Sequence, residues 1–230
     1  MKISVIGATG LIGSKVIELL EGDGQDVVAA SRSSGADVLT GEGLVDALAG
    51  ADVLIDVTNS PSFDDGPVMD FFTRSSANLV AAAKEAGVGH YVALSIVGVD
   101  GLPQSGYMRA KVMQEKTIVE SGLPYTIVRA TQFLEFAEGI VGSLDTGDEV
   151  RVPDALIQPI AADDVAAEVA GAAVAGPADG VVNIGGAEKV SFAGLARAVL
   201  SEQGSDKPVV VDPQATYFGT PLQQTSLVTI

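Results

Sequence analysis

The chain has 230 residues, of which 47% are hydrophobic and 19% charged, a composition typical of a globular α/β domain rather than of a disordered segment. Its formal net charge of −17 argues against nucleic acid or an anionic membrane as a partner. With no cysteine and one histidine, the chain excludes disulfides, thiolate metal sites and cysteine nucleophiles, and we expect neither a metal site nor a histidine-based triad.

Short β-branched segments alternate with alanine- and leucine-rich segments along the first 130 residues. Strands are expected, in chain order, at 2–6, 26–30, 36–38, 52–57, 90–95 and 125–129. Helices are expected at about 11–21, 42–49, 66–86, 105–121, 133–142, 163–175 and 191–202. The strands are almost continuously apolar, which is typical of a parallel sheet covered on both faces. The alternation predicts a doubly wound α/β parallel sheet, a Rossmann fold, with strand order 3-2-1-4-5-6.

After residue 130 the alternation weakens, with short strands expected at 149–153, 181–184 and 208–211 and a polar loop from 212. No linker or break in composition marks a boundary. We therefore predict one domain over 1–230, with a cofactor-binding core over about 1–130 and a small substrate-covering elaboration over about 131–230. No apolar run approaches the roughly 20 residues that span a bilayer, and the glycines near the N-terminus are unsuited to a secretion signal, so a cytoplasmic location is expected.

A glycine-rich segment, GATGLIG at 7–13, follows the first predicted strand and opens the first predicted helix. In a βαβ unit, Gly7 allows the tight turn, Gly10 lets a pyrophosphate approach the backbone, and Gly13 permits close packing of helix on strand. The phosphates would meet free N–H groups at the positive end of the helix dipole. The predicted contacts are Gly7, Thr9, Gly10, Leu11, Ile12 and Gly13. The alternative is a glycine-rich turn that binds no ligand.

The second predicted strand is followed by Ser31 and Arg32, with no acidic residue. A dinucleotide without a 2′-phosphate usually meets an Asp or Glu at this place. Arg32 instead offers a bidentate fork for a phosphate, and Ser31 offers a hydroxyl. We therefore predict NADP (NADPH) rather than NAD as the cofactor. The alternative is an arginine that only faces solvent.

Three polar residues follow from the next predicted elements. Ser95 ends the strand at 90–95, at the carboxyl edge where open sheets bind ligands. Tyr107 and Lys111 lie four positions apart in a predicted helix, and therefore on one face of it. From spacing alone, the pair is either a proton-transfer device or an aromatic and a basic residue on a solvated helix.

Taken together, these segments resemble the atypical, NmrA-like branch of the short-chain dehydrogenase/reductase superfamily. The resemblance covers most of the chain and rests on GATGLIG at 7–13, HYVALSIVG at 90–98, YMRAK at 107–111, GLPYTIVRATQF at 122–133 and PIAADDVA at 159–166. It implies a Ser-Tyr-Lys site beside the nicotinamide. Tyr107 would donate its proton to a carbonyl oxygen, Lys111 would supply a nearby positive charge and hold the ribose, and Ser95 would orient the substrate oxygen.

The resemblance also implies further cofactor contacts, namely Thr58, Asn59, Ala130, Thr131 and Phe133. For Thr58 and Asn59 a turn that caps a helix is the alternative. The predicted function is NADPH-dependent reduction of a small carbonyl or quinone, with the oligomeric state, monomer or homodimer, left open. Many NmrA-like relatives lack the tyrosine, so a non-catalytic NADP-binding redox sensor is one alternative. An epimerase or dehydratase that uses the cofactor transiently is another.

Overall fold

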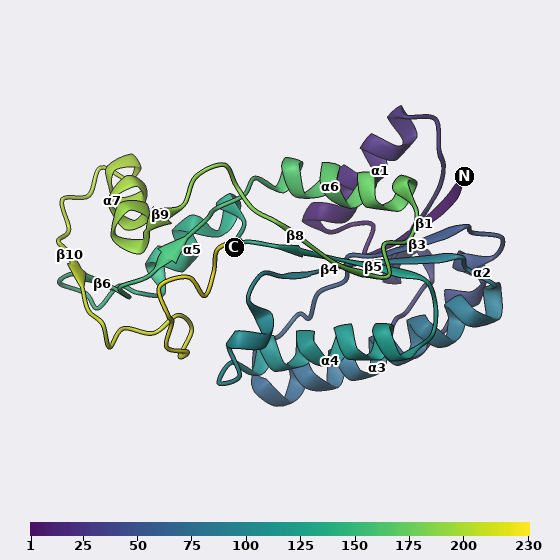
Figure 1. Ribbon diagram of the computed structural model, residues 1–230, viewed down its shortest axis with the longest axis horizontal. Helices are drawn as coiled ribbons and strands as arrows, with labels where there is room; N and C mark the ends of the chain where they lie inside the picture. Colours follow the sequence, from purple (N-terminus) through teal and green to yellow (C-terminus); the bar gives the residue numbers. More distant parts are fainter.

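The computed structural model describes all residues 1–230 and contains a six-stranded sheet in the order β2-β1-β3-β4-β5-β8 (Figure 1). These strands are β1 (Lys2–Ile6), β2 (Asp26–Ala30), β3 (Val53–Asp56), β4 (His90–Ile96), β5 (Tyr125–Ala130) and β8 (Gly180–Ile184). Every neighbouring pair is parallel. The predicted doubly wound Rossmann fold is confirmed.

Helices cover both faces of the sheet (Figure 1). On one face lie α1 (Leu11–Gly22) and α6 (Ala162–Ala175); on the other lie α2 (Leu44–Leu48), α3 (Asp65–Ala86) and α4 (Gly106–Glu120). Strand side chains alternate between these layers: Val5 and Val92 pack with α1 and α6, whereas Leu54 and Tyr91 pack with the other three helices. Burial of both faces explains the continuous apolar strand sequences.

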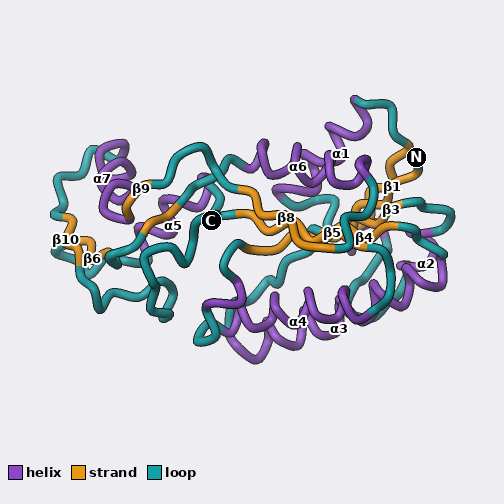
Figure 2. Tube along the Cα trace, in the orientation of Figure 1, coloured by secondary structure: helices purple, strands orange, loops and turns teal.

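The remaining elements lie beyond the carboxyl ends of the strands, at the left of Figure 1. They are α5 (Ala137–Gly142), β6 (Val150–Val152), β7 (Leu156–Ile157), β9 (Val190–Ser191), α7 (Phe192–Glu202) and β10 (Val209–Val211). They enclose a separate apolar cluster that includes Val152, Ile157 and Phe192. Figure 2 shows how much of this part is loop. No helix in the structure is both long and apolar enough to cross a membrane.

The strand expected at 36–38 does not form, and the predicted order 3-2-1-4-5-6 is wrong at both edges. Only residues 31–35 separate 36–38 from β2, whereas a crossover between parallel strands needs a dozen or more. Side chains of α3 hold the segment as a turn instead: Asn78 donates to the Val38 carbonyl oxygen and Arg74 to that of Leu39, each at 2.9 Å. The sixth strand is β8, which pairs with β5.

The other expected elements form within a few residues of their predicted ends. The helix expected at 133–142 divides into a 3-10 turn, Leu134–Phe136, and α5. The segments expected at 149–153 and 208–211 pair with each other as β6 and β10, and the pair β7–β9 was not predicted. From residue 212 the chain has no helix or extended strand, as expected, but Leu227 and Val228 are buried. This tail therefore packs against the rest of the chain.

Candidate functional site

The glycine loop between β1 and α1 has the geometry that close packing requires. Gly7 has φ +92°, and a Cβ there would lie 2.9 Å from the carbonyl oxygen of Val57. A Cβ at Gly13 would lie 2.2 Å from the carbonyl oxygen of Gly7, far inside van der Waals contact. The Gly7 and Ala8 N–H groups donate to the Ala30 carbonyl at 3.1 and 3.2 Å. The loop thus turns against the ends of β2 and β3 and allows no larger residue at Gly13.

The start of α1 is open to an anion. No side chain caps the helix at Gly10, and its first turn carries no acidic residue. The N–H groups of Leu11, Ile12 and Gly13 form no hydrogen bond within the protein. Thr9 and Gly10 are exposed beside them. Free N–H donors at the positive end of a helix dipole suit a phosphate, so this loop fits the pyrophosphate of a dinucleotide.

Ser31 and Arg32 lie at the end of β2, next to the glycine loop. Ser31 begins a short 3-10 turn, Arg32–Ser34, in which the Ser31 N–H donates to Ser34 Oγ at 2.9 Å. Arg32 is exposed and forms no ion pair. A guanidinium without a carboxylate partner, in a chain of net charge −17, leaves its donors available to a phosphate.

At the end of β3, Asp56 is buried and its carboxylate accepts four hydrogen bonds. Two come from Thr58, through its N–H at 3.0 Å and its hydroxyl at 2.7 Å. The Tyr91 hydroxyl and Gln114 Nε2 each donate at 2.9 Å. Because α3 begins only at Asp65, Thr58 and the residue after it do not cap that helix. Thr58 is instead part of a polar corner at the carboxyl edge of the sheet.

Tyr107 lies in the first turn of α4, where Ser105 caps the helix. Its hydroxyl donates to Asn59 Oδ1 at 2.9 Å, and its ring lies 5.2 Å from that of Phe63 and 6.0 Å from that of Phe72. Burial raises the pKa of Tyr107 to about 12, against a smaller opposing effect of the Asn59 hydrogen bond. The phenol is therefore protonated at neutral pH.

The loop before Tyr107, residues 98–106, is fastened to the start of α3. Arg109 donates to Asp65 at 2.7 Å and to the Pro103 carbonyl oxygen at 2.8 Å. At Gly106, a Cβ would lie 1.9 Å from the Asp65 carboxylate. This contact requires glycine at the start of α4, and it places the first turn of that helix against α3.

Lys111, one turn beyond Tyr107, is only 3% exposed. Its ammonium donates to the Leu94 carbonyl oxygen at 2.9 Å and to Gln114 Oε1, and it lies 4.6 Å from the centroid of the Phe72 ring. Burial lowers the pKa of Lys111 to about 8, although two nearby carboxylates oppose the shift. Lys111 therefore does not belong to a solvated helix face.

Ser95 is buried at the end of β4, and its hydroxyl has no hydrogen-bond partner. It is in register with Arg129 of β5, whose guanidinium forms a bidentate pair with Glu115 of α4 at 2.9 and 2.6 Å. No hydrogen bond joins Ser95, Tyr107 and Lys111 to one another: Tyr107 bonds to the end of β3, and Lys111 bonds to β4 and within α4.

The last residue of β5 and those that follow it lie along the same edge of the sheet. Ala130 is buried, and the Thr131 hydroxyl donates to the Gln158 carbonyl oxygen. The Phe133 ring stacks on Phe136 at 5.5 Å. The chain thus leaves the sheet here toward the part formed by α5 and α7, and these residues lie between the sheet and that part.

Sequence reasoning did not single out Asp56 and Gln114, which the structure joins to Lys111. A signal existed for Gln114, because it lies three residues after Lys111 and so on the same helix face. For Asp56 the signal was an acid that closes an apolar strand. Gln132 is also buried, with neither amide atom hydrogen bonded, and no pattern in the sequence indicated this.

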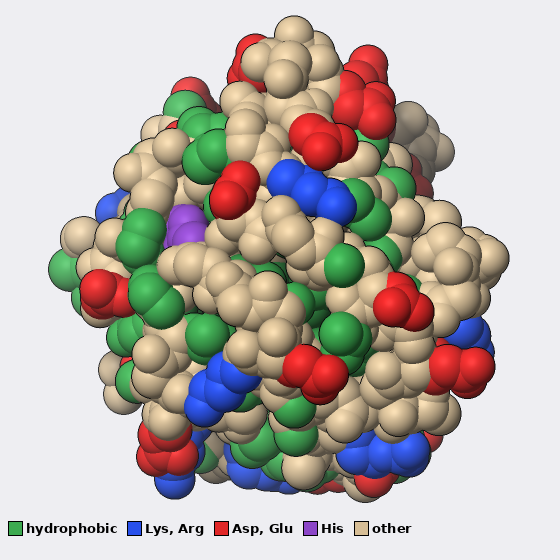
Figure 3. All heavy atoms as spheres, turned by 90° about the vertical axis from the view of Figure 1, so that its right-hand side faces the viewer, with side chains coloured by type: hydrophobic (Ala, Val, Ile, Leu, Met, Phe, Trp, Pro, Cys, Tyr) green, Lys and Arg blue, Asp and Glu red, His purple; other side chains and the backbone are tan.

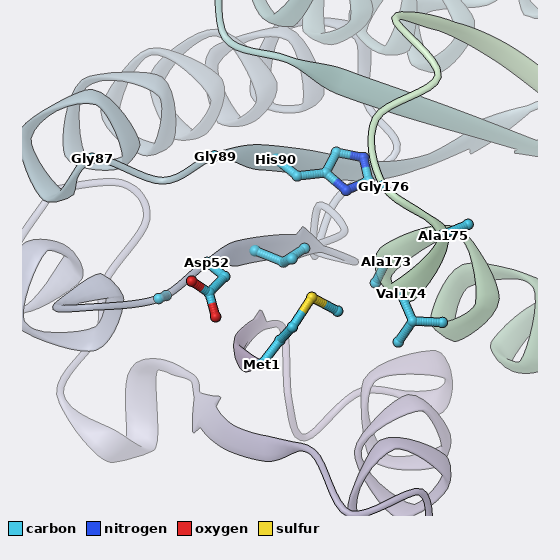
Figure 4. Close-up of a pocket in the computed structure, with 11 residues that line it drawn as sticks. Met1, Asp52, Gly87, Gly89, His90, Ala173, Val174, Ala175 and Gly176 are labelled. Atoms are coloured by element: carbon cyan, nitrogen blue, oxygen red, sulfur yellow. The ribbon is translucent and has the colours of Figure 1, made fainter.

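A hollow of about 380 Å³ lies at the opposite edge, where β3 and β4 begin and α6 ends (Figure 4). Its lining includes Asp52, His90 and Val174. Figure 3 shows this end of the molecule, with acidic and basic side chains interspersed and the histidine visible among them. His90 Nε2 lies 2.9 Å from Thr126 Oγ1, and the residue is 3% exposed. His90 accordingly has a structural place, remote from the glycine loop.

A family model described as NAD(P)H-binding matches residues 7–175, more than half of the chain. The Photosystem II assembly factor Ycf39 of Cyanophora paradoxa is 30% identical over 156 residues, 62% of this chain and 48% of that protein. The NAD(P)H azoreductase of Xenophilus azovorans is 30% identical over 149 residues, 58% of this chain and 49% of that protein. The chain thus spans about half the length of these curated relatives.

Solved structures share the fold. A dTDP-glucose 4,6-dehydratase from Streptomyces venezuelae, solved with NAD bound, has a TM-score of 0.74 and 18% identity, over 99% of this chain and 89% of that one. At such identity the likeness establishes the common architecture alone.

Proposed function

The chain belongs to the NAD(P)H-binding family, within the atypical, NmrA-like short-chain dehydrogenase/reductases, and we propose that it is an oxidoreductase that uses NADPH to reduce a small carbonyl or quinone. In this proposal the free N–H groups at Leu11–Gly13 hold the pyrophosphate, and Ser31 and Arg32 hold the 2′-phosphate. Thr58, Asn59 and residues 130–133 border the nicotinamide half. When bound, NADPH supplies the hydride.

The chain's own residues supply the proton and the charge. Tyr107, protonated at neutral pH, donates its phenolic proton to the substrate oxygen. Lys111, with a pKa of about 8, carries a positive charge at pH 7 that favours the resulting phenolate. The Ser95 hydroxyl, which has no partner in the protein, hydrogen bonds to the same substrate oxygen and orients it.

The observation that carries this proposal is the burial of Lys111 without an ion pair. A buried charge that lacks a paired partner costs several kcal/mol, and an apolar side chain of similar length would pack there without that cost. This cation lies one helical turn from a phenol, at the ligand-binding edge of an NAD(P)H-binding fold. Its retention is best explained by its electrostatic effect on that phenol and on the bound ligand.

A second candidate is a non-catalytic NADP-binding protein that signals the redox state of its cofactor to a protein partner. It is favoured by the engagement of the Tyr107 hydroxyl with Asn59 and by the absence of direct bonds among Ser95, Tyr107 and Lys111. The relative Ycf39 is an assembly factor, which agrees with such a role. An epimerase or dehydratase has no support here beyond the shared fold.

The test is NADPH consumption against a panel of quinones, aldehydes and ketones, with the wild type and Tyr107→Phe. The variant keeps the ring packing and loses only the hydroxyl, so its rate should fall by about 10²–10⁴, the usual contribution of a positioned acid, while NADPH affinity stays nearly constant. Tyr125→Phe makes the same chemical change at the start of β5 and should turn over like the wild type. Tight NADPH binding with no turnover of any substrate would favour the second candidate.

A further inference from the structure

A continuous set of buried polar side chains connects β3 to Lys111. Gln114 Nε2 donates to Asp56 Oδ2 at 2.9 Å, and Gln114 Oε1 accepts from the Lys111 ammonium. Asp56 and Gln114 are each 1% exposed. The set crosses from the sheet to α4 within the core, so its members are held by packing as well as by hydrogen bonds.

Only one orientation of the Gln114 amide satisfies both neighbours. The Asp56 carboxylate accepts hydrogen bonds and cannot donate, whereas the Lys111 ammonium donates and cannot accept. The NH₂ group of Gln114 must therefore face Asp56, and its carbonyl oxygen must face Lys111. In this way the carboxylate determines which end of the amide meets the ammonium.

The same end of β3 also holds Tyr107. Thr58 donates twice to Asp56, and the next residue, Asn59, accepts the Tyr107 hydroxyl. We call residues 56–59 the β3 corner. The β3 corner is thus linked to Lys111 through Gln114 and to Tyr107 through Asn59.

We infer that Asp56 and Gln114 are positioning residues for Lys111: they fix its ammonium in the place, relative to Tyr107, from which it acts on the phenol and the cofactor. This inference rests on the proposed function. A purely structural set is a weaker explanation, because well-packed apolar residues usually stabilise a core as well as a buried polar set or better.

Few titratable groups surround the ammonium. Asp56 comes from β3 and Tyr91 from β4, and Tyr91 donates to Asp56. Glu115 comes from α4, on which Tyr107 lies one turn before Lys111. The Phe72 ring of α3 also contacts the ammonium but does not titrate. Both carboxylates raise the pKa of Lys111, and Asp56 has the larger effect, since Glu115 is paired with the Arg129 guanidinium.

The experiment is a titration of Lys111 by NMR of lysine labelled with ¹³C at Cε, with its signal assigned by its loss in Lys111→Met. The wild-type midpoint should lie near 8. Asp56→Asn removes the carboxylate and Gln114→Met removes the acceptor, so each should lower the midpoint by about one unit. Tyr91→Phe is the matched control: it removes a donor to the same carboxylate, in the same core, and should leave the midpoint near 8. A midpoint unchanged in both test variants would overturn the inference.

Two further measurements, of activity and of hydrogen exchange, distinguish a failure of this inference from a failure of the proposed function. If the wild type is active, its loss of activity at alkaline pH should begin at lower pH in Asp56→Asn and Gln114→Met. At pH 8, kcat should fall about fivefold, because a midpoint lowered by about one unit leaves about one fifth as much of the protonated lysine. If the wild type turns nothing over, the proposed function fails, yet the titration still tests the positioning. If neither variant folds, hydrogen exchange of the wild-type Gln114 side-chain NH₂ decides: slow exchange supports its bond to Asp56, and fast exchange contradicts it.

Discussion

Lys111 and Arg32 are both cations without an ion pair, but one is buried and the other is exposed, which suits them to different roles. Lys111 is buried, so its ammonium is held in one place and its pKa is lowered to about 8. Arg32 is exposed, and solvent screens it until an anion approaches. The buried cation suits a fixed task beside Tyr107, whereas the exposed one suits the recognition of a mobile phosphate.

Replacement of Arg32 tests the choice of cofactor. Because a charge-assisted fork to a phosphate contributes about 1.5–3 kcal/mol, Arg32→Ala should reduce the preference for NADPH over NADH by at least about tenfold. Fluorescence titration with both cofactors measures this. Arg197→Ala, at another exposed arginine without an ion pair, should leave the preference as it is. Equal affinity of the wild type for the two cofactors would contradict the prediction.

At the scale of elements, α1 and α4 bring the two halves of the candidate site to the carboxyl edge of the sheet. α1 can pack closely against the turn after β1 because Gly13 has no side chain. α4 is held by Asp65 of α3 at its first turn and by the Arg129–Glu115 pair further along. Each helix is thus fixed where it meets the candidate ligand, and we expect little tolerance for shifts there.

Two glycine substitutions in α1 should differ in their effect on stability. Gly13→Ala places a Cβ 2.2 Å from the Gly7 carbonyl, so the helix must move; it should lower the free energy of unfolding by about 1–3 kcal/mol and weaken cofactor binding. Gly22→Ala meets no atom within 4 Å and should be neutral or stabilising by up to about 1 kcal/mol. Chemical denaturation and cofactor titration of both variants measure the contrast, and equal behaviour would refute it.

For the whole molecule, His90 joins the starts of β4 and β5 at the edge remote from the glycine loop. Burial lowers its pKa below the ordinary value of 6.5, so the folded state favours the neutral ring. Its contribution to stability is therefore complete above pH 6.5 and is lost as the pH falls from 6.5 through the lower pKa of the folded state.

Comparison with a variant isolates this contribution from that of the 30 acidic residues. The free energy of unfolding of wild type and His90→Gln should be measured by denaturant titration between pH 8 and pH 5. The free energy of unfolding of the wild type minus that of the variant should be constant above pH 6.5. It should decrease below pH 6.5, because only the wild type takes up a proton at this site on unfolding. Parallel curves over the whole range would show that His90 does not titrate on unfolding.

The sequence by itself determined the features that depend on neighbours in the chain. The glycines at 7–13 specify a turn and a helix start, and apolar periodicity specifies most strands and helices, because both express local backbone and burial preferences. Even the absence of a strand at 36–38 was available in principle, since too few residues separate it from β2 for a crossover. The strand at 181–184 was also expected, but its place as the sixth strand of the sheet was not, because the pairing of β8 with β5 joins segments more than fifty residues apart.

Only the tertiary structure decided how the polar groups of the site meet. Spacing placed Tyr107 and Lys111 on one helix face but did not determine that the first bonds to Asn59 and the second is buried on Gln114. Asp56 and Gln114 lie 58 positions apart in the chain. Their contact depends on how α4 is positioned along the sheet and rotated about its own axis. Such contacts depend on the shape of the whole core, to which many side chains contribute at once, and no local pattern records them.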